Sequence, residues 1–195
     1  MKILGDKKLV RKTSETEIKI TFNLYGSGKS RIETEYKFFN HLIEELAFYA
    51  LFDLEIKAKG DLAHHVIEDT AIVLGRLLRS YLSEIRYPLV RFGYSITPMD
   101  DALIIVSIDL SGRSFFNSNL SIKRTMIEDT ASEDLLHFLR TFSENGRFNL
   151  HILQLAGKDD HHIFEAAFKG LGQAFRIAKN RDDGRESVTS TKGSL

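Results

Sequence analysis

Apolar and polar residues alternate along 16–24, TEIKITFNL, in the period-two pattern of a half-buried strand. GSGK after it favours a turn. Residues 36–52 carry apolar side chains at helical spacing, 54–60 predict a short strand, and 65–85 predict a second helix. The apolar stripe of that second helix is Ile67, Ala71, Leu74 and Leu78. The first half of the chain therefore predicts strands, a helix, a strand and a helix.

The second half of the chain repeats this order. It predicts a strand over 102–112, a helix over 132–145, a strand over 148–157 and a helix over 162–179. Two such halves favour an α+β fold in which two similar sheets bury their helices against each other. Because nothing resembles a linker, we expect one domain over 1–195, with a pseudo-repeat of about 1–87 and 88–180 and a C-terminal tail over 181–195.

A duplicated motif, HHxxE, marks the same repeat. It occurs as His64, His65 and Glu68, and again as His161, His162 and Glu165. The offset is 161 − 64 = 97, and Gly75 and Gly172 keep it. Each motif opens a predicted helix, where residues three or four apart share a face. Adjacent histidines point about 100° apart on a helix, so the two histidines of a pair can bind two different ions more easily than they can bind the same ion. The repetition favours metal binding over a solvated helix start.

Composition restricts the partners and the chemistry. Lys plus Arg and Asp plus Glu are both 27, so no net field attracts nucleic acid or an anionic membrane. The absence of cysteine excludes disulfides, thiolate metal sites and cysteine nucleophiles. The charged start lacks the apolar run of a signal peptide, and LAFYALF at 46–52 is too short to span a membrane. We expect a soluble, cytoplasmic protein with no nucleic-acid or membrane partner.

Imidazole and carboxylate ligands together suit Mn, Fe, Co, Ni or Zn. Zinc-protease patterns are missing, because HExxH does not occur and HxxEH would need histidine where the chain has Asp69 and Ala166. His41, inside a predicted helix, and His151, on the strand before the second pair, are further candidate ligands, although each alone is equally well a partly buried histidine. His137 shows no such relation and is interpreted as structural.

Motifs along the whole chain match a known family in its own order. They are RKTSET, FFNHLIEELA, GDLAHHVIEDTAIVLG, RFG, PMDDAL, DLSGR, LHI, DDHHIFEAAFKG and STKG. The chain resembles the imidazoleglycerol-phosphate dehydratases of histidine biosynthesis. The resemblance implies a hydro-lyase that converts D-erythro-imidazole glycerol phosphate to imidazole acetol phosphate with two Mn²⁺ ions per active site, through a metal-bound imidazolate. It also implies two four-stranded sheets that sandwich four helices, and active sites between the subunits of an octahedral 24-mer.

The matching motifs also imply which residues form the site. The implied metal ligands are His41, His64, His65, Glu68, His151, His161, His162 and Glu165, or three histidines and one glutamate per ion. The implied catalytic residues are Glu15, Glu68 and Glu165, with Glu15 as acid/base. The implied substrate and phosphate contacts are Glu15, Glu45, Arg91, Arg113, Lys169, Ser190 and Lys192. The tail is disordered by composition, and the resemblance implies that it orders over bound phosphate.

The chain departs from the family pattern at a few positions. Asn40 stands for a usual Asp, Glu45 for a usual Gln, Tyr49 for a usual His, Tyr25 for a usual Asp and Asp159 for a usual Asn. The segment GDLAHH, which ends in the first histidine pair, is also about three residues shorter than its equivalent in the family. No implied ligand is lost. These substitutions leave open an alternative function, a metal-binding homo-oligomer that has lost its catalytic activity. A dinuclear metal hydrolase also fits the ligands, but not DLSGR and STKG.

Overall fold

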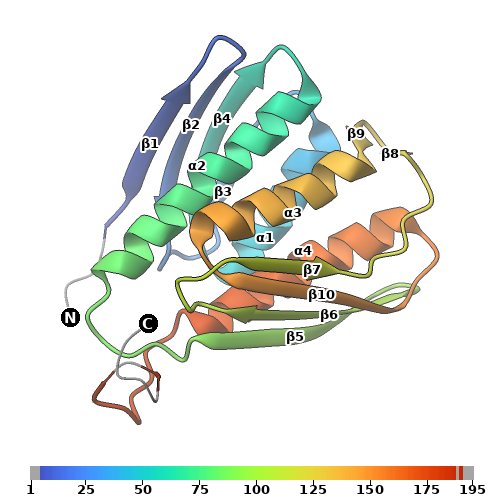
Figure 1. Ribbon diagram of the computed structural model, residues 1–195. Helices are drawn as coiled ribbons and strands as arrows, with labels where there is room; N and C mark the ends of the chain where they lie inside the picture. Colours follow the sequence, from blue (N-terminus) through green and yellow to red (C-terminus); the bar gives the residue numbers. More distant parts are fainter. Residues whose placement is uncertain (1–4, 188, 191–195) are drawn as a thin grey trace.

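Two four-stranded sheets and four helices make up the computed structural model, which describes residues 5–187, 189 and 190 (Figure 1). The first sheet has the strand order β1-β2-β4-β3, the second has the order β5-β6-β10-β7, and β8 and β9 form a small third sheet. The strands are β1 (Lys7–Lys12), β2 (Thr16–Asn23), β3 (Ser30–Glu33), β4 (Asp53–Gly60), β5 (Phe92–Met99), β6 (Ala102–Asp109), β7 (Phe115–Ser118), β8 (Met126–Ile127), β9 (Thr130–Ala131) and β10 (Asn149–Ala156). The helices are α1 (Lys37–Ala50), α2 (Ala63–Glu84), α3 (Ser132–Gly146) and α4 (Asp160–Ala178).

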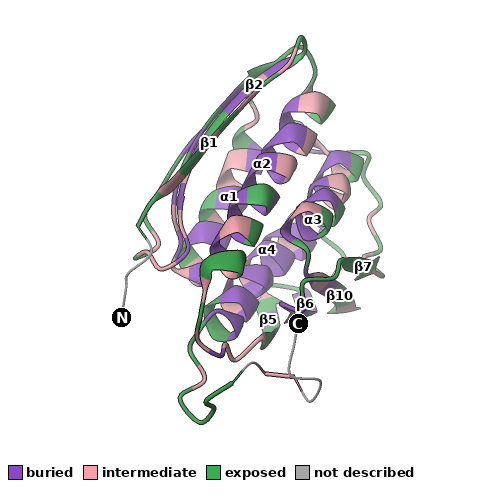
Figure 2. Ribbon diagram, turned by 60° about the vertical axis from the view of Figure 1, so that its left-hand side comes forward, coloured by how far each residue is buried: buried purple, intermediate pink, exposed green. Residues whose placement is uncertain are grey.

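The helices lie between the two large sheets (Figure 1). α1 and α2 pack on the first sheet, α3 and α4 pack on the second, and the helical layers meet through the pairs α1–α4 and α2–α3. Buried positions line the helix faces and the inner faces of the strands (Figure 2). At the centre, the rings of Phe39 from α1 and Phe138 from α3 meet edge to face, 5.3 Å apart. The α+β prediction of two similar halves is confirmed.

The two halves match in detail. In each large sheet the third strand, β4 or β10, runs antiparallel to its central neighbour and parallel to the edge strand. α1 and α3 end alike, because Leu51 and Arg147 both take a left-handed conformation, with φ of 54° and 53°. In both cases the next residue, Phe52 or Phe148, donates its N–H back into the last turn. These ends are 147 − 51 = 96 residues apart, whereas α2 and α4 begin 160 − 63 = 97 apart.

The repeated glycines lie where the helix pairs touch. A Cβ on Gly172 of α4 would lie 2.8 Å from the carbonyl oxygen of Leu46 in α1. A Cβ on Gly75 of α2 would lie 2.8 Å from the backbone nitrogen of Gly146 in α3. Both contacts are with backbone, which cannot rotate away. The 97-residue glycine spacing therefore marks the two helix contacts of the core.

The outward faces of the two sheets differ in chemistry. The first presents charged side chains, among them Lys19 on β2 and Lys57 on β4. On the second, Ile96 of β5 is 63% exposed and lies opposite Ile105 of β6, which lies opposite Leu153 of β10. An apolar row therefore crosses three strands. We call the surface formed by Tyr94, Ile96, Ile105, Leu153 and Leu155 the apolar outer face.

Several elements differ from the sequence-based expectation. β1, β3, β5 and β7 were not located individually, and α2 and α4 begin about two residues before the predicted starts. The described part of the tail is not disordered: Thr189 Oγ1 donates to the Leu89 carbonyl at 2.6 Å, and Arg91 Nη1 donates to the Thr189 carbonyl at 2.6 Å. Among the described residues, no helix combines the length and apolarity needed to cross a membrane.

Candidate metal centre

The first histidine group joins the N-terminal turns of α1 and α4. Asp159 caps α4, because its side chain accepts a hydrogen bond from the backbone N–H of His161 at 2.9 Å. His161 and, one turn later, Glu165 then face His41 of α1. The Nε2 atoms of His41 and His161 each lie 3.6 Å from an oxygen of Glu165. One ligand atom from each residue lies within 4.8 Å of the others, which makes the three a candidate metal site.

The second group joins the N-terminal turns of α2 and α3. His64 Nε2 lies 3.7 Å from Glu68 Oε2, and His137 Nε2 lies 3.3 Å from Glu68 Oε1. All three residues again offer atoms within 4.8 Å of one another. His137, which the sequence interpretation treated as structural, is therefore part of a candidate site. His41 and His137 are 137 − 41 = 96 residues apart, which is the offset that the structure gives for the ends of α1 and α3.

Carboxylates hold the histidines by the ring nitrogen Nδ1. His65 Nδ1 lies 2.8 Å from Asp61, and His162 Nδ1 lies 2.8 Å from Asp101. His64 Nδ1 lies 2.7 Å from a third carboxylate, that of Asp134. A carboxylate at Nδ1 orients the ring and leaves the lone pair of the neutral imidazole at Nε2, which is how metal-ligating histidines are usually held.

The same contacts set the protonation of these groups. The hydrogen bond from His162, together with the backbone N–H groups of Lys158 and Asp159, lowers the pKa of Asp101 to about 2. Asp101 in turn raises the pKa of His162, and Asp61 raises the pKa of His65. Asp101 therefore stays ionised at neutral pH and makes the His162 imidazole a more basic ligand.

Glu165 is held as a buried anion. It is only 6% exposed, and burial opposes its ionisation, but Lys169 Nζ at 2.7 Å from Oε1 outweighs this and lowers the pKa of Glu165. Lys169 also lies 3.9 Å from Glu45, whose pKa is raised by burial although Lys169 and His41 oppose that rise. Two of the residues expected to contact substrate, Glu45 and Lys169, thus lie beside the first histidine group.

Glu15 and His151 occupy different surroundings. Glu15 Oε2 lies 3.9 Å from His65 Nδ1, so it borders the first motif. His151 is exposed on the outward side of β10, near Phe115. Ala156 at the end of β10 is 156 − 151 = 5 positions further on, which is roughly 17 Å along a strand. Since Ala156 is near the turn that carries Asp101, His151 is too far from His162 to bind the same ion within one chain.

The expected phosphate contacts are spread over the chain. Arg91 does not face the histidines: its Nε and Nη2 bond the two oxygens of Asp109 at 2.6 and 2.9 Å, and its φ is 73°. Arg113 is exposed in the loop before β7, and its carbonyl accepts a hydrogen bond from Asn149. Ser190 is partly buried beyond the bonded Thr189, and Lys192 lies outside the described residues.

The residues that depart from the family pattern have local partners. Asn40 bonds to Thr34 twice, accepting from its hydroxyl at 2.6 Å and donating to its carbonyl at 3.1 Å. Tyr49 packs against Gly172 with Lys169 Nζ 6.0 Å from its ring centroid. Tyr25 donates from its hydroxyl to the Lys179 carbonyl at 2.9 Å. These contacts explain how the residues fit, and none displaces a candidate ligand.

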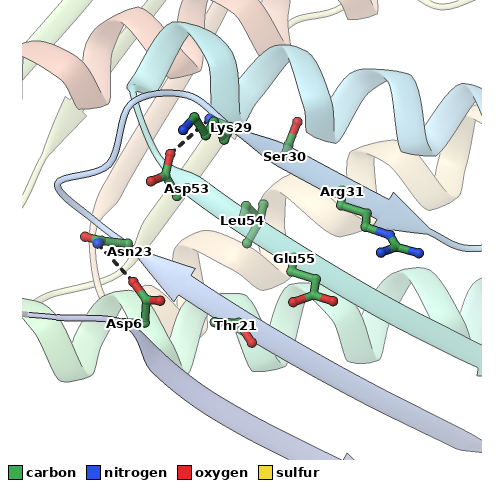
Figure 3. A pocket seen from close by; sticks show the side chains of 9 residues that line it. All are labelled: Asp6, Thr21, Asn23, Lys29, Ser30, Arg31, Asp53, Leu54 and Glu55. Atoms are coloured by element: carbon green, nitrogen blue, oxygen red, sulfur yellow. Dashed lines mark hydrogen bonds between the residues drawn. The ribbon is translucent and has the colours of Figure 1, made fainter.

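A polar hollow lies elsewhere, at the outward side of the first sheet (Figure 3). Its volume is about 380 Å³, and Asn23, Lys29 and Asp53 are among its lining residues. Asp53 accepts hydrogen bonds from the backbone N–H groups of Ser27 and Lys29, so it is already satisfied. None of the residues expected to bind metal lines this hollow.

The two histidine groups fit a divalent ion by donor type and spacing. Both offer imidazole nitrogens and one carboxylate, a set that suits Mn, Fe, Co or Zn. Two donors at right angles, each about 2.1 Å from an ion, would be about 3 Å apart. The separations of 3.3 to 3.7 Å are close to that value, so small side-chain movements would close each group on an ion.

Comparisons with known proteins agree on one family. The model of the family described as imidazoleglycerol-phosphate dehydratase matches residues 34–175. A dehydratase of that name from Acetivibrio thermocellus is 43% identical over 188 residues, covering 95% of this chain and 96% of its own. One from Clostridium botulinum is 42% identical over 191 residues, covering 96% and 97%.

Solved structures are similar over nearly the whole chain. The crystal structure of the Pyrococcus furiosus dehydratase has a TM-score of 0.83 at 40% identity, covering 96% of this chain and 100% of its own. That of the Staphylococcus aureus dehydratase has a TM-score of 0.84 at 31% identity, covering 91% and 100%. The chain belongs to the imidazoleglycerol-phosphate dehydratase family and is a carbon–oxygen lyase of the hydro-lyase class.

Proposed function

We propose that this protein dehydrates D-erythro-imidazole glycerol phosphate to imidazole acetol phosphate in histidine biosynthesis, using two Mn²⁺ ions per active site. The observation that carries the proposal is the duplicated histidine–glutamate group, with Glu165 facing His41 and His161 and with Glu68 facing His64. Since the reaction belongs to amino-acid biosynthesis, we also propose that the protein acts in the cytoplasm.

The proposed ligands are the six histidines and two glutamates that the family motifs imply. They are His41, His64, His65, Glu68, His151, His161, His162 and Glu165. Bound ions would supply fixed positive charge that stabilises negative charge developing on the imidazole ring of the substrate. The mixed imidazole and carboxylate set supports Mn²⁺ over ions that prefer thiolates.

The other site residues have separate proposed roles. Glu15, at 3.9 Å from His65, would move the proton at the reacting carbons. Glu68 and Glu165 would contribute to catalysis as metal-binding carboxylates. Lys169 lies next to Glu165 and would contact the substrate with Glu45. Arg113 and the tail residues Ser190 and Lys192 would bind the phosphate, since arginine and lysine suit its oxygens.

Arg91 supports phosphate binding differently from the expectation. Its guanidinium is engaged by Asp109 and by the Thr189 carbonyl. Arg91 would therefore hold the tail that carries Ser190. Its hydrogen bond to the Thr189 carbonyl would orient the tail toward the phosphate. The proposed direct contacts with the phosphate would come from Arg113, Ser190 and Lys192.

We propose that complete active sites form between chains of a large homo-oligomer, a 24-mer by family resemblance. His151 lies roughly 17 Å along β10 from the end of the strand near His162, so we infer that a second chain would complete the site that uses it. It also projects from the same side of the second sheet as the apolar outer face, since it lies opposite Ser107, which lies opposite Tyr94. A second copy that covers this face would bring both surfaces together.

A metal-binding assembly without turnover is the competing function. Its support is the substitution at Glu45 and Tyr49, which lie beside Lys169 in the first histidine group. Such a protein would bind two ions per chain and leave the substrate unchanged. A dinuclear hydrolase would instead cleave simple phosphoesters.

The test is water loss from imidazole glycerol phosphate, detected by mass spectrometry before and after Mn²⁺ is returned to chelated protein. We expect water loss only with the metal. Glu165→Gln should remove activity and lower the metal content, because the amide of glutamine carries no charge for the ion. Full activity of that variant would overturn the proposal, and bound metal without water loss would favour the competing assembly.

A further inference from the structure

The pseudo-repeat relates His137 to His41, which faces Glu165. α1 and α3 end 96 residues apart, and the same offset relates His41 to His137. Each of these histidines lies on the first helix of its half, and each points Nε2 at the glutamate of an HHxxE motif. The distances are 3.6 Å from His41 to Glu165 and 3.3 Å from His137 to Glu68.

The two glutamates present their oxygens alike. In each case Oε2 faces the first histidine of the pair, at 3.7 Å from His64 in one half and 3.6 Å from His161 in the other. In each case Oε1 faces a side-chain nitrogen on the opposite side. Oε1 of Glu165 faces both Nζ of Lys169 at 2.7 Å and Nε2 of His41 at 3.6 Å, whereas Oε1 of Glu68 faces Nε2 of His137 at 3.3 Å. Oε2 therefore faces a proposed ligand on the same helix in both halves, and Oε1 of Glu165 is held by the hydrogen bond from Lys169.

The halves differ in which residue holds Oε1. Lys169 lies one turn after Glu165, and the equivalent position after Glu68 is 169 − 97 = 72, which is Ile72. Isoleucine cannot donate a hydrogen bond. At Glu68, His137 therefore approaches Oε1, which is the equivalent of the Glu165 oxygen that Lys169 binds at 2.7 Å. Because Ile72 cannot hold this oxygen and His137 Nε2 lies 3.3 Å from it, the place of His137 fits a residue that orients the carboxylate.

We propose that His137 is a positioning residue, whose Nε2–H donates to Glu68 Oε1 and turns Glu68 Oε2 toward His64 and the metal ion. This rests on the proposed metal dependence of the site. The ring of His137 also packs edge to face on that of His64, with centroids 4.9 Å apart, so one residue contacts both ligands of the second group. Partners that orient ligands in this way typically contribute 10–100-fold to metal affinity.

Two substitutions separate a hydrogen-bond donor from ring packing and from direct ligation. His137→Phe keeps a ring against His64 and removes the nitrogen. His137→Gln removes the ring, but its amide N–H can still donate a hydrogen bond in place of Nε2–H. A neutral amide is a poor metal ligand, so this variant would lose affinity if His137 bound the ion directly. Arg140→Gln, an exposed change one turn further along α3, is the matched control.

The measurement is Mn²⁺ affinity of the full-length chelated protein, with free Mn²⁺ followed by its electron paramagnetic resonance signal. We expect His137→Phe to weaken one of the two classes of site by about 10–100-fold. His137→Gln should stay within about threefold of the unsubstituted protein, and Arg140→Gln should match it. A thermal melt of each chelated variant checks that it folds.

Two results would overturn the proposal. Unchanged affinity of a folded His137→Phe would leave the histidine a packing role alone, and equal losses in His137→Phe and His137→Gln would make it a direct ligand. If the unsubstituted protein bound no Mn²⁺, the metal-dependent function itself would fail, which is a different outcome.

Discussion

At the scale of single residues, Lys179 is an unusual feature of the core. It caps α4, is 4% exposed, and donates from Nζ to the carbonyls of Leu24 at 2.5 Å and Leu51 at 3.0 Å. The ring of Phe52 lies 4.8 Å from Nζ. Burial lowers the pKa of Lys179 to about 8, and the charge of Arg176 adds to this. The ammonium ties α4 to the end of α1 but costs stability while it is charged.

This predicts a stability that depends on pH. The native pKa of about 8 lies below the ordinary lysine pKa of 10.5, so between these limits the unfolded chain binds the Lys179 proton and the native protein does not. Stability from this group therefore rises as pH increases from about 8 to 10.5, by roughly 3 kcal/mol in total. The free energies of unfolding in urea of the unsubstituted protein and of Lys179→Met should change relative to each other by this amount over the same pH range. A constant difference between them would contradict the assignment.

The ligand residues show what sequence can and cannot give at this scale. The HHxxE pairs were identifiable because three demanding residues recur at one offset. His137 was missed because its counterpart, His41, is 96 residues away rather than 97, and that shift becomes visible only when the helix ends of the structure are compared. The pairing of Arg91 with Asp109 could not be predicted, since it depends on how β5 and β6 align.

At the scale of secondary-structure elements, the close helix contacts depend on Gly75 and Gly172. Gly172→Ala should destabilise the protein, because the new Cβ would lie 2.8 Å from the Leu46 carbonyl oxygen and 3.0 Å from the Ala50 backbone nitrogen. Overpacking of about 1–3 kcal/mol should exceed the helix preference of alanine, about 1 kcal/mol over glycine. Urea midpoints measure the difference.

The matched control for this prediction is Gly5→Ala, since nothing lies within 4 Å of a Cβ at Gly5. We expect its urea midpoint to stay near that of the unsubstituted protein. Gly75→Ala should behave as Gly172→Ala does, because the new Cβ would lie 2.8 Å from the Gly146 backbone nitrogen. If the Gly172→Ala midpoint did not fall, the close contact of α1 and α4 would be wrong.

Helices and central strands were predictable from pattern, and edge strands were not. β2 alternates with Ile18, Ile20 and Phe22 buried, so its period is plain. β5 inverts the rule: Tyr94 and Ile96 face outward, while glycine and small hydroxyl side chains face α4. Small residues are needed there because the helix backbone lies directly against the strand, as the 1.9 Å approach of a Cβ on Gly93 to the Ala174 oxygen indicates.

At the scale of the whole molecule, the inverted β5 pattern gives the second sheet its apolar outer face. Exposed apolar side chains gathered in a row across three strands are typical of an interface. Ile96→Lys should weaken association, because a lysine would be placed in the row with Ile105 and Leu153. We expect light scattering to show smaller particles for this variant.

Thr21→Lys is the matched control for the interface. It adds the same charge to the outward side of the first sheet, where Thr21 lies opposite Lys8 and Glu55. The particle size of this variant should stay that of the unsubstituted protein. Equal particle sizes for all three proteins would show that copies do not associate through the apolar outer face.

The central claim is that one active site draws ligands from two chains, with His151 supplied by a partner. The direct measurement is complementation: His151→Ala and Glu165→Gln chains, each expected to be inactive, are dissociated, mixed, reassembled with Mn²⁺ and assayed for water loss from imidazole glycerol phosphate. We predict that the mixture regains activity, because some hybrid sites contain an intact His151 and an intact Glu165. A mixture as inactive as its two components would contradict a site shared between chains.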